Sequence, residues 1–210
     1  YAVSEDGTRE AMFSELADQT SGLGWLPDGS LLAVFMTSRK LMRSDGAGGF
    51  VEHADLSDVA TFHCNDMVVD AVGNAYVGNF GFDLHGRASF APADLALVRP
   101  DGTASVAAKG LAFPNGSVIT PDGGTLIVGQ SFGGSYQAFT IGADATLSEQ
   151  RIWAEISGTA PDGCCLDAAG GIWFSDAIGS QLIRVVEGGE VTHRVPTPMP
   201  TFACMLGGND

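Results

Sequence analysis

The sequence predicts an all-β fold, a single β-propeller domain over residues 1–210 built of four-stranded antiparallel blades. The first observation behind this prediction is a repeat. A turn that carries Asp and Gly recurs along the chain at intervals of 42, 52 and 45 residues, marked by Asp28, Asp70, Asp122 and Asp167. Propeller blades repeat at about this spacing. The second observation is that helical periodicity is absent and short apolar runs stand on either side of each turn.

Each repeat predicts four strands. A short apolar strand leads into the turn, and a second strand rich in Val, Ile, Leu and aromatic residues follows it, which is the pattern of a β-hairpin. In the first complete copy we expect strands near residues 22–25, 30–35, 40–43 and 49–54, separated by turns rich in Gly, Asp and Ser.

The two ends of the chain fit the same register. Residues 10–16 resemble the outer strands of a preceding repeat. By comparison with the other copies, residues 207–210 correspond to the turn that precedes the second strand of a repeat. We therefore expect about four full blades and two partial ones, with parts of the first and last blades of a six-bladed ring lying outside this sequence.

Composition and charge narrow the function classes. A net charge of −15 with only ten Lys and Arg argues against a nucleic-acid partner, because binding phosphates needs clustered cations. No run approaches the roughly 20 apolar residues of a membrane helix, so we expect no membrane partner. The cysteines show no Cys-x-x-Cys spacing, which favours buried thiols, a reducing compartment and a cytoplasmic location. The oligomeric state is left open.

Two polar residues stand in matching frames, Asn115 in Pro-Asn-Gly and Asp162 in Pro-Asp-Gly. Each precedes the first strand of its repeat. The turn aspartates, including those spelled Pro-Asp-Gly, stand between two strands and are interpreted as turn chemistry. A repeating β unit that places one oxygen-bearing side chain at the same point in successive copies can aim several oxygens at one ion. We therefore predict a site for a hard metal ion.

An ordered series of motifs extends this pattern over most of the chain, from about residue 22 to residue 210. The series comprises Asn65-Asp66, then Pro114-Asn115-Gly116, then Pro161-Asp162-Gly163 followed by Leu166-Asp167 and Ile172-Trp173. In this the chain resembles the gluconolactonase and regucalcin (senescence marker protein) superfamily. The resemblance implies a six-bladed propeller that binds a divalent cation and hydrolyses small lactones. Calcium is favoured, with Zn²⁺, Mn²⁺ and Mg²⁺ as alternatives.

The resemblance also implies roles for individual residues. Asn115 and Asp162 would ligate the metal, and Asn65 would lie beside it and contact the substrate or the metal. Two departures stand out. The family's glutamate ligand in a Glu-Gly-Pro motif has no counterpart here, and its substrate-binding arginine is replaced by His63. Specificity for a sugar lactone is therefore in question, and residues 80–92 form an insertion where specificity is expected to lie.

These residues predict a metal-dependent hydrolase of small lactones or related esters. Asp162 would orient or deprotonate the attacking water while the cation polarises the carbonyl. His63 would bind substrate or relay the proton if it faces the channel, or else pack in the core or at the rim. Phe80, Phe82 and Phe113, together with Phe132, are expected near the channel mouth, in the pocket or in the core.

Two alternatives remain open at this point. Residues 129–133 spell Gly-x-Ser-x-Gly around Ser131, but the nucleophile elbow of a serine hydrolase needs a helix after the serine, and the sequence there predicts a strand. The other alternative is a propeller that binds a ligand or a metal without turnover.

Overall fold

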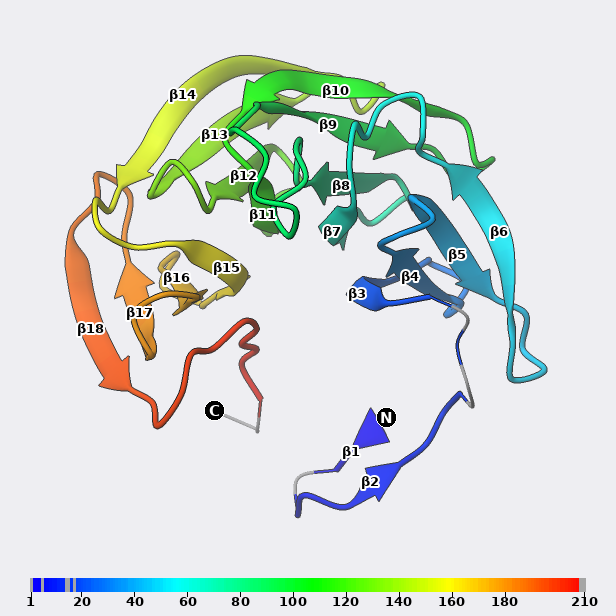
Figure 1. Cartoon of the computed structure of the whole chain (residues 1–210), viewed down its shortest axis with the longest axis horizontal. Helices are drawn as coiled ribbons and strands as arrows, with labels where there is room; N and C mark the ends of the chain where they lie inside the picture. Colours follow the sequence, from blue (N-terminus) through cyan, green and yellow to red (C-terminus); the bar gives the residue numbers. More distant parts are fainter. Residues whose placement is uncertain (1, 5, 14–15, 17, 208–210) are drawn as a thin grey trace.

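The computed structural model describes residues 2–4, 6–13, 16 and 18–207, and in these residues all regular structure is strand. Four antiparallel sheets of four strands follow one another along the chain and fan around a common axis, as Figure 1 shows. A separate two-stranded hairpin, β1 (Ala2–Val3) and β2 (Arg9–Glu10), lies apart from them. Among all the residues described by the structure, no helix is long and apolar enough to cross a bilayer.

The sixteen strands of the four blades follow the predicted repeat. The first blade contains β3 (Thr20–Trp25), β4 (Leu31–Phe35), β5 (Lys40–Ser44) and β6 (Phe50–Asp55). The second contains β7 (Cys64–Val69), β8 (Ala75–Asn79), β9 (Ala93–Val98) and β10 (Ala104–Leu111). The third contains β11 (Pro114–Ile119), β12 (Thr125–Gln130), β13 (Ser135–Ile141) and β14 (Leu147–Glu155). The fourth contains β15 (Pro161–Leu166), β16 (Ile172–Asp176), β17 (Gln181–Val185) and β18 (Val191–Pro196).

Within each blade the strands pair in chain order, so every blade is a simple meander. The first strands of the blades, β3, β7, β11 and β15, contact one another around the axis and are called the inner strands below. The all-β propeller architecture and the strands predicted in the first repeat are confirmed, with boundaries that agree within about two residues.

The predicted turns hold the inner hairpins together. In the second blade, the Asp70 carboxylate accepts the N–H groups of Val72 at 2.9 Å and Asn74 at 2.8 Å. The same geometry recurs at Asp167 in the fourth blade. Gly73 follows in the left-handed region with φ of 95°, where a side chain would be strained. The turn aspartates are therefore structural, as the sequence indicated.

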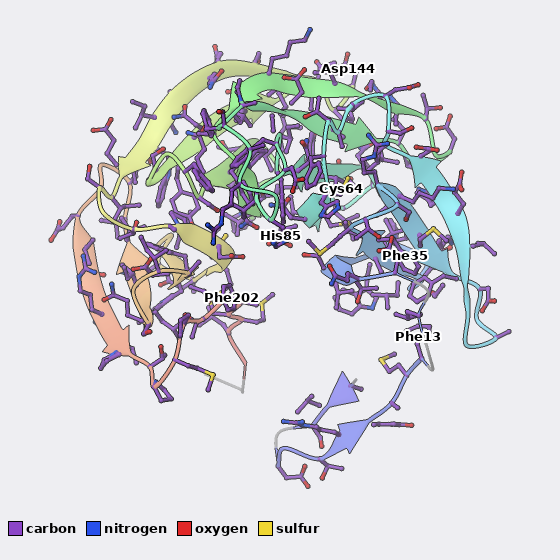
Figure 2. All side chains as sticks on the ribbon, viewed as in Figure 1. Phe13, Phe35, Cys64, His85, Asp144 and Phe202 are labelled. Carbon is purple, nitrogen blue, oxygen red and sulfur yellow. The ribbon has the colours of Figure 1, made fainter. Side chains whose placement is uncertain are left out.

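Side chains fill the space between neighbouring blades, as Figure 2 shows, and the buried clusters there are apolar. Alternate residues of a strand face opposite neighbours, so Leu126 and Val128 of β12 pack toward the second blade and Ile127 toward the fourth. Burying each such side chain contributes about 1.5–3 kcal/mol. A buried hydrogen bond from Tyr76 Oη to the Ala145 carbonyl, at 2.8 Å, joins the second and third blades. The blades are thus held together mainly by packing.

Three smaller predictions can be compared with the structure. The outer strand expected over residues 10–16 is wrong in position, because the hairpin ends at Glu10 and residues 14 and 15 lie outside the described part. Of the turn expected at residues 207–210, only Gly207 is described. All four cysteines are free thiols.

Candidate active site

The site begins with an irregularity that is repeated in all four inner strands. Each pairs regularly with its neighbour until its N-terminal part, where the register shifts and two residues are left out of the ladder. The residue pairs at this point are Ser21-Gly22, Asn65-Asp66, Asn115-Gly116 and Asp162-Gly163. A bulge of this kind re-aims side chains. Equivalent side chains are thereby presented toward the axis from four successive blades.

Glycine at the second position of the pair lets the inner strands approach closely. A Cβ on Gly116 would overlap the carbonyl oxygen of Asp162 in the next blade, and a Cβ on Gly22 would lie 2.6 Å from Met67 N. A Cβ on Gly163 would likewise lie 2.8 Å from the Phe202 carbonyl oxygen. The Pro-x-Gly frames therefore have a packing cause, since only glycine leaves room for the neighbouring backbone.

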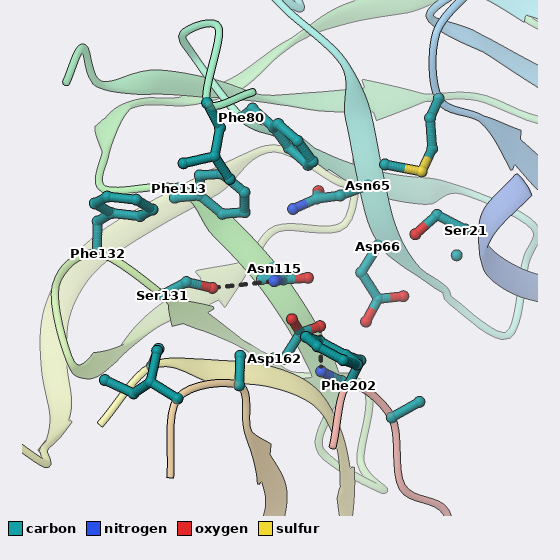
Figure 3. A pocket seen from close by; sticks show the side chains of 18 residues that line it. Ser21, Asn65, Asp66, Phe80, Phe113, Asn115, Ser131, Phe132, Asp162 and Phe202 are labelled. Carbon is teal, nitrogen blue, oxygen red and sulfur yellow. Dashed lines mark hydrogen bonds between the residues drawn. The ribbon is translucent and has the colours of Figure 1, made fainter. Parts of the chain in front are cut away.

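The polar side chains of the pairs share one cavity of about 640 Å³. Figure 3 shows Asn65, Asp66, Asn115 and Asp162 pointing into the same hollow from the second, third and fourth blades. The sequence predicted that Asn115 and Asp162 converge. The structure places both side chains in this cavity.

Ser131 fixes the orientation of Asn115. Its hydroxyl donates to the Pro161 carbonyl at 2.6 Å and accepts the Asn115 amide N–H at 3.0 Å. With the amide nitrogen on Ser131, the Asn115 carbonyl oxygen is directed toward Asp66, as Figure 3 shows. This hydrogen-bond chain leaves Asn115 poised as an oxygen donor.

The two carboxylates lie in an unfavourable electrostatic environment. Burial, together with the smaller effect of the nearby Asp66 charge, raises the pKa of Asp162 to about 6, although hydrogen bonds from the Gly163 N–H and the Asn115 amide oppose the shift. Burial also raises the pKa of Asp66, against one hydrogen bond from the Met67 N–H at 2.8 Å. Two buried acids with few donors are stabilised by a cation, which would lower both pKa values.

The donor set fits a divalent metal ion with a preference for oxygen. Two carboxylates and two amides offer only oxygen ligands of the kind that Ca²⁺ and Mg²⁺ take. Both polar atoms of the Asn65 amide are buried without a protein hydrogen bond, and a buried polar group of this kind calls for a partner. Among the described residues, no three His, Cys, Asp or Glu side chains gather as metal ligands. A metal here would therefore depend on the amide oxygens.

Comparison with known families agrees with this geometry. The whole chain, residues 1–210, matches the model of the SMP-30/Gluconolactonase/LRE-like region. The chain belongs to this family. The superfamily inferred from the motif series is confirmed.

Solved structures of the SMP-30/gluconolactonase family share the fold. A gluconolactonase from Xanthomonas campestris is 25% identical, with a TM-score of 0.77 over 97% of this chain and 70% of its own. Regucalcin from Agrobacterium tumefaciens, a calcium-binding protein, is 21% identical, with a TM-score of 0.74 over 88% of this chain and 62% of its own. A luciferin-regenerating enzyme is 17% identical, with a TM-score of 0.79 over 92% of this chain and 68% of its own. The last two similarities establish the fold alone.

His63, expected either to face the channel or to pack in the core or at the rim, does not line this cavity. Its ring stacks on Phe62 at 4.2 Å and lines a separate shallow hollow with Asp18 and His85. His63 lies just before β7, and its ring centroid is 5.8 Å from that of Phe80, which does line the cavity. A role for His63 in substrate binding is left as a prediction without a place in this cavity.

Sequence reasoning missed two residues of the site. The first is Asp66. In a regular strand, Asn65 and Asp66 would point to opposite faces, and only the bulge brings both inward. The signal was present, since the other three blades carry glycine at this position. Ser131 was considered only as a nucleophile. It lies in the turn between β12 and β13 with no helix after it, so the nucleophile elbow is absent.

Proposed function

We propose that the protein is a divalent-metal-dependent hydrolase of small lactones or related esters. The observation that carries the proposal is the convergence of Asn65, Asp66, Asn115 and Asp162 from three blades in one cavity. Membership of the gluconolactonase family supports the same reaction class. Calcium is the favoured cation because amide and carboxylate oxygens at irregular positions suit its flexible coordination, with Mn²⁺, Mg²⁺ and Zn²⁺ as alternatives.

A bound cation would polarise the substrate carbonyl and stabilise the oxyanion that forms on it. The protein's own residues then have separate tasks. Asn65, Asp66 and Asn115 hold oxygen atoms around the reaction centre. Asp162, with a pKa of about 6 before any cation binds, is suited to accept a proton from the attacking water near neutral pH.

The reaction balances with water as the only co-reactant. The water oxygen bonds to the carbonyl carbon as its proton passes to the Asp162 carboxylate. The ring carbon–oxygen bond then breaks, and the proton moves to the departing alkoxide. The product is a hydroxy acid, and Asp162 returns to its starting state.

A metal titration joined to an activity assay tests the proposal. Chelator-treated protein is titrated with Ca²⁺, Mn²⁺, Mg²⁺ and Zn²⁺ while the thermal midpoint and the hydrolysis of γ- and δ-lactones and aryl esters are followed by pH-stat. We expect activity that the chelator abolishes and a cation restores, and a loss of about a hundredfold or more in Asp162→Asn. Cation binding with no turnover on any substrate would favour the alternative, a binding module without chemistry.

A further inference from the structure

The cavity above the carboxylates and amides is mostly apolar. Ten of its eighteen lining residues are Ala, Leu, Ile, Met or Phe. Of the residues that the structure describes, no lysine, arginine or histidine lines it. The carboxylates and amides lie on the inner strands β7, β11 and β15. Most of the apolar lining residues lie in loops between strands, and Phe202 and Ala203 lie in the segment after β18. The cavity therefore has a polar floor and an apolar surround.

Three phenylalanines, Phe80, Phe113 and Phe132, form one continuous face of this surround, called the phenylalanine wall below. Phe80 and Phe113 stack with their ring centroids 4.5 Å apart, and Phe113 and Phe132 lie 5.3 Å apart. Figure 3 shows all three on the same side of Asn115. Phe132 keeps 52% of its surface exposed although it packs against other aromatic rings. Phe80 and Phe113 are almost buried, so Phe132 supplies most of the exposed surface of this face. An aromatic face beside a polar floor is suited to a ligand with one apolar part.

The backbone of Phe113 adds a second, independent observation. Its φ is 63°, in the left-handed region that bulky side chains rarely adopt, yet its side chain is only 5% exposed. Strain of this kind persists where the surrounding structure requires it, and it is concentrated at binding and active sites. Here the strained position sets the middle ring of the phenylalanine wall.

We propose that the preferred substrate carries an alkyl or aryl substituent, which packs on the phenylalanine wall while its lactone or ester carbonyl faces Asn115 and Asp162. This inference rests on the proposed function and specifies its substrate class. A volume of about 640 Å³ accommodates a ring with a side chain of several carbons.

A polyhydroxylated sugar lactone fits these surroundings poorly. Each of its hydroxyls needs a hydrogen-bond partner when it is buried. Besides the two carboxylates and two amides, the described lining offers two side-chain hydroxyls, Ser21 and Ser131, and Ser131 is already bonded to Asn115 and Pro161. The substituted lactone leaves no polar group unpaired on the phenylalanine wall.

The first test compares substrates on the cation-loaded protein. The value of kcat/KM is measured for γ-lactones with unbranched alkyl chains from methyl to hexyl, and for glucono-δ-lactone. We expect a rise of about two- to fourfold for each methylene until the cavity is filled, and a sugar lactone at least about a hundredfold below the best alkyl lactone. A flat chain-length profile, or a preference for glucono-δ-lactone, would overturn this inference while leaving the hydrolase proposal in place.

A matched pair of variants locates the effect. Phe132→Ala should flatten the chain-length profile, because it removes the exposed ring of the phenylalanine wall. Ile152→Ala removes an apolar side chain of similar exposure, 56%, that lies in β14 and does not line the cavity, and it should leave the profile within about twofold of the original. Equal effects of the two substitutions would contradict the assignment of the phenylalanine wall.

Binding without turnover separates this inference from the proposed function. Calorimetry with 5-alkyl-2-pyrrolidinones, lactams that resist hydrolysis, measures occupancy of the cavity directly. Affinity that rises with chain length supports the inference, even if no lactone is hydrolysed and the hydrolase proposal fails. Affinity that does not change from methyl to hexyl would overturn it.

Discussion

The two ends of the inner hairpins use the same residue, aspartate, for opposite purposes. At the turn end, Asp122 accepts the Gly124 N–H at 3.0 Å and the Thr120 hydroxyl at 2.6 Å, and these hydrogen bonds lower its pKa. At the cavity end, Asp162 accepts one backbone N–H, is mostly buried, and has its pKa raised to about 6. Both aspartates are the middle residue of a Pro-Asp-Gly motif. Position in the hairpin, and not the motif, decides whether the pKa of the carboxylate is lowered by hydrogen bonds or raised by burial.

Glycine differs between the two ends as well, and this gives the largest expected effect. At the cavity end Gly116 is needed for space, because a Cβ there would overlap the backbone of the next blade. At the turn end Gly123 is needed for its φ of 71°, with open space around it. We expect Gly116→Ala to lower the free energy of unfolding by about 3 kcal/mol and Gly123→Ala by about 1 kcal/mol. Urea denaturation of the two variants compares them, and equal losses would contradict the packing argument.

The next prediction concerns the sign of a stability change at Asp162. Burial raises the folded-state pKa of Asp162 from 3.8 to about 6. The contribution of protonated Asp162 to the free energy of unfolding is therefore fully present below pH 4 and is lost as the pH rises through 6. In chelator at pH 8, Asp162→Asn should therefore be more stable than the original protein by roughly 2–3 kcal/mol. Urea midpoints between pH 4 and pH 8 measure this difference. Added Ca²⁺ should reverse the order, and Asp122→Asn, the control, should show neither effect.

A substitution at Asp167 tests the turn end, where the pH dependence of stability is expected to have the opposite sign. Arg184 donates to both of its carboxylate oxygens, at 2.5 and 3.1 Å, and the two side chains are only 13–15% exposed. These bonds lower the pKa of Asp167 to about 2, so the stability they give is present above pH 4 and is lost as the pH falls toward 2. Asp167→Asn should cost about 1–2 kcal/mol at pH 7, and less at pH 3. Hydrolysis, measured by pH-stat, should be unchanged, and a loss of activity equal to that of Asp162→Asn would remove the distinction between the two ends.

Ser131 gives the smallest effect, because it acts through Asn115. Ser131→Ala removes the hydrogen bond that orients the amide and should reduce kcat/KM about tenfold, with a matching loss of Ca²⁺ affinity. Ser131→Thr keeps the hydroxyl and should restore most of both. A fluorophosphonate probe should leave Ser131 unlabelled. Labelling at this residue, or activity that survives chelation, would assign it the nucleophile role instead.

The blade repeat could be predicted from the sequence because its signals are local. Turn aspartates, left-handed glycines and alternating apolar residues recur within each hairpin, and each reports on its immediate neighbours. The pairing of Asn115 with Asp162 was predictable for a related reason, since both occupy one position of a repeat and a propeller turns sequence repetition into convergence in space.

Other parts of the site depend on contacts between blades, which no local pattern records. The inward direction of Asp66 depends on a bulge in β7. The position of His63 against Phe62 and Phe80 depends on how the loop before β7 packs. The role of Ser131 depends on the Pro161 carbonyl of the following blade. These features are set by tertiary packing, and local sequence motifs do not determine them.

The repeated bulge has a consequence for redesign. Because each blade contributes one side chain at an equivalent point, the coordination sphere can be edited blade by blade without rebuilding the scaffold. Ser21 of the first blade occupies the fourth equivalent point and lines the same cavity. Exchanging Ser21 for an aspartate or a histidine would add a harder or a softer donor, and the choice would retune which ion the protein selects.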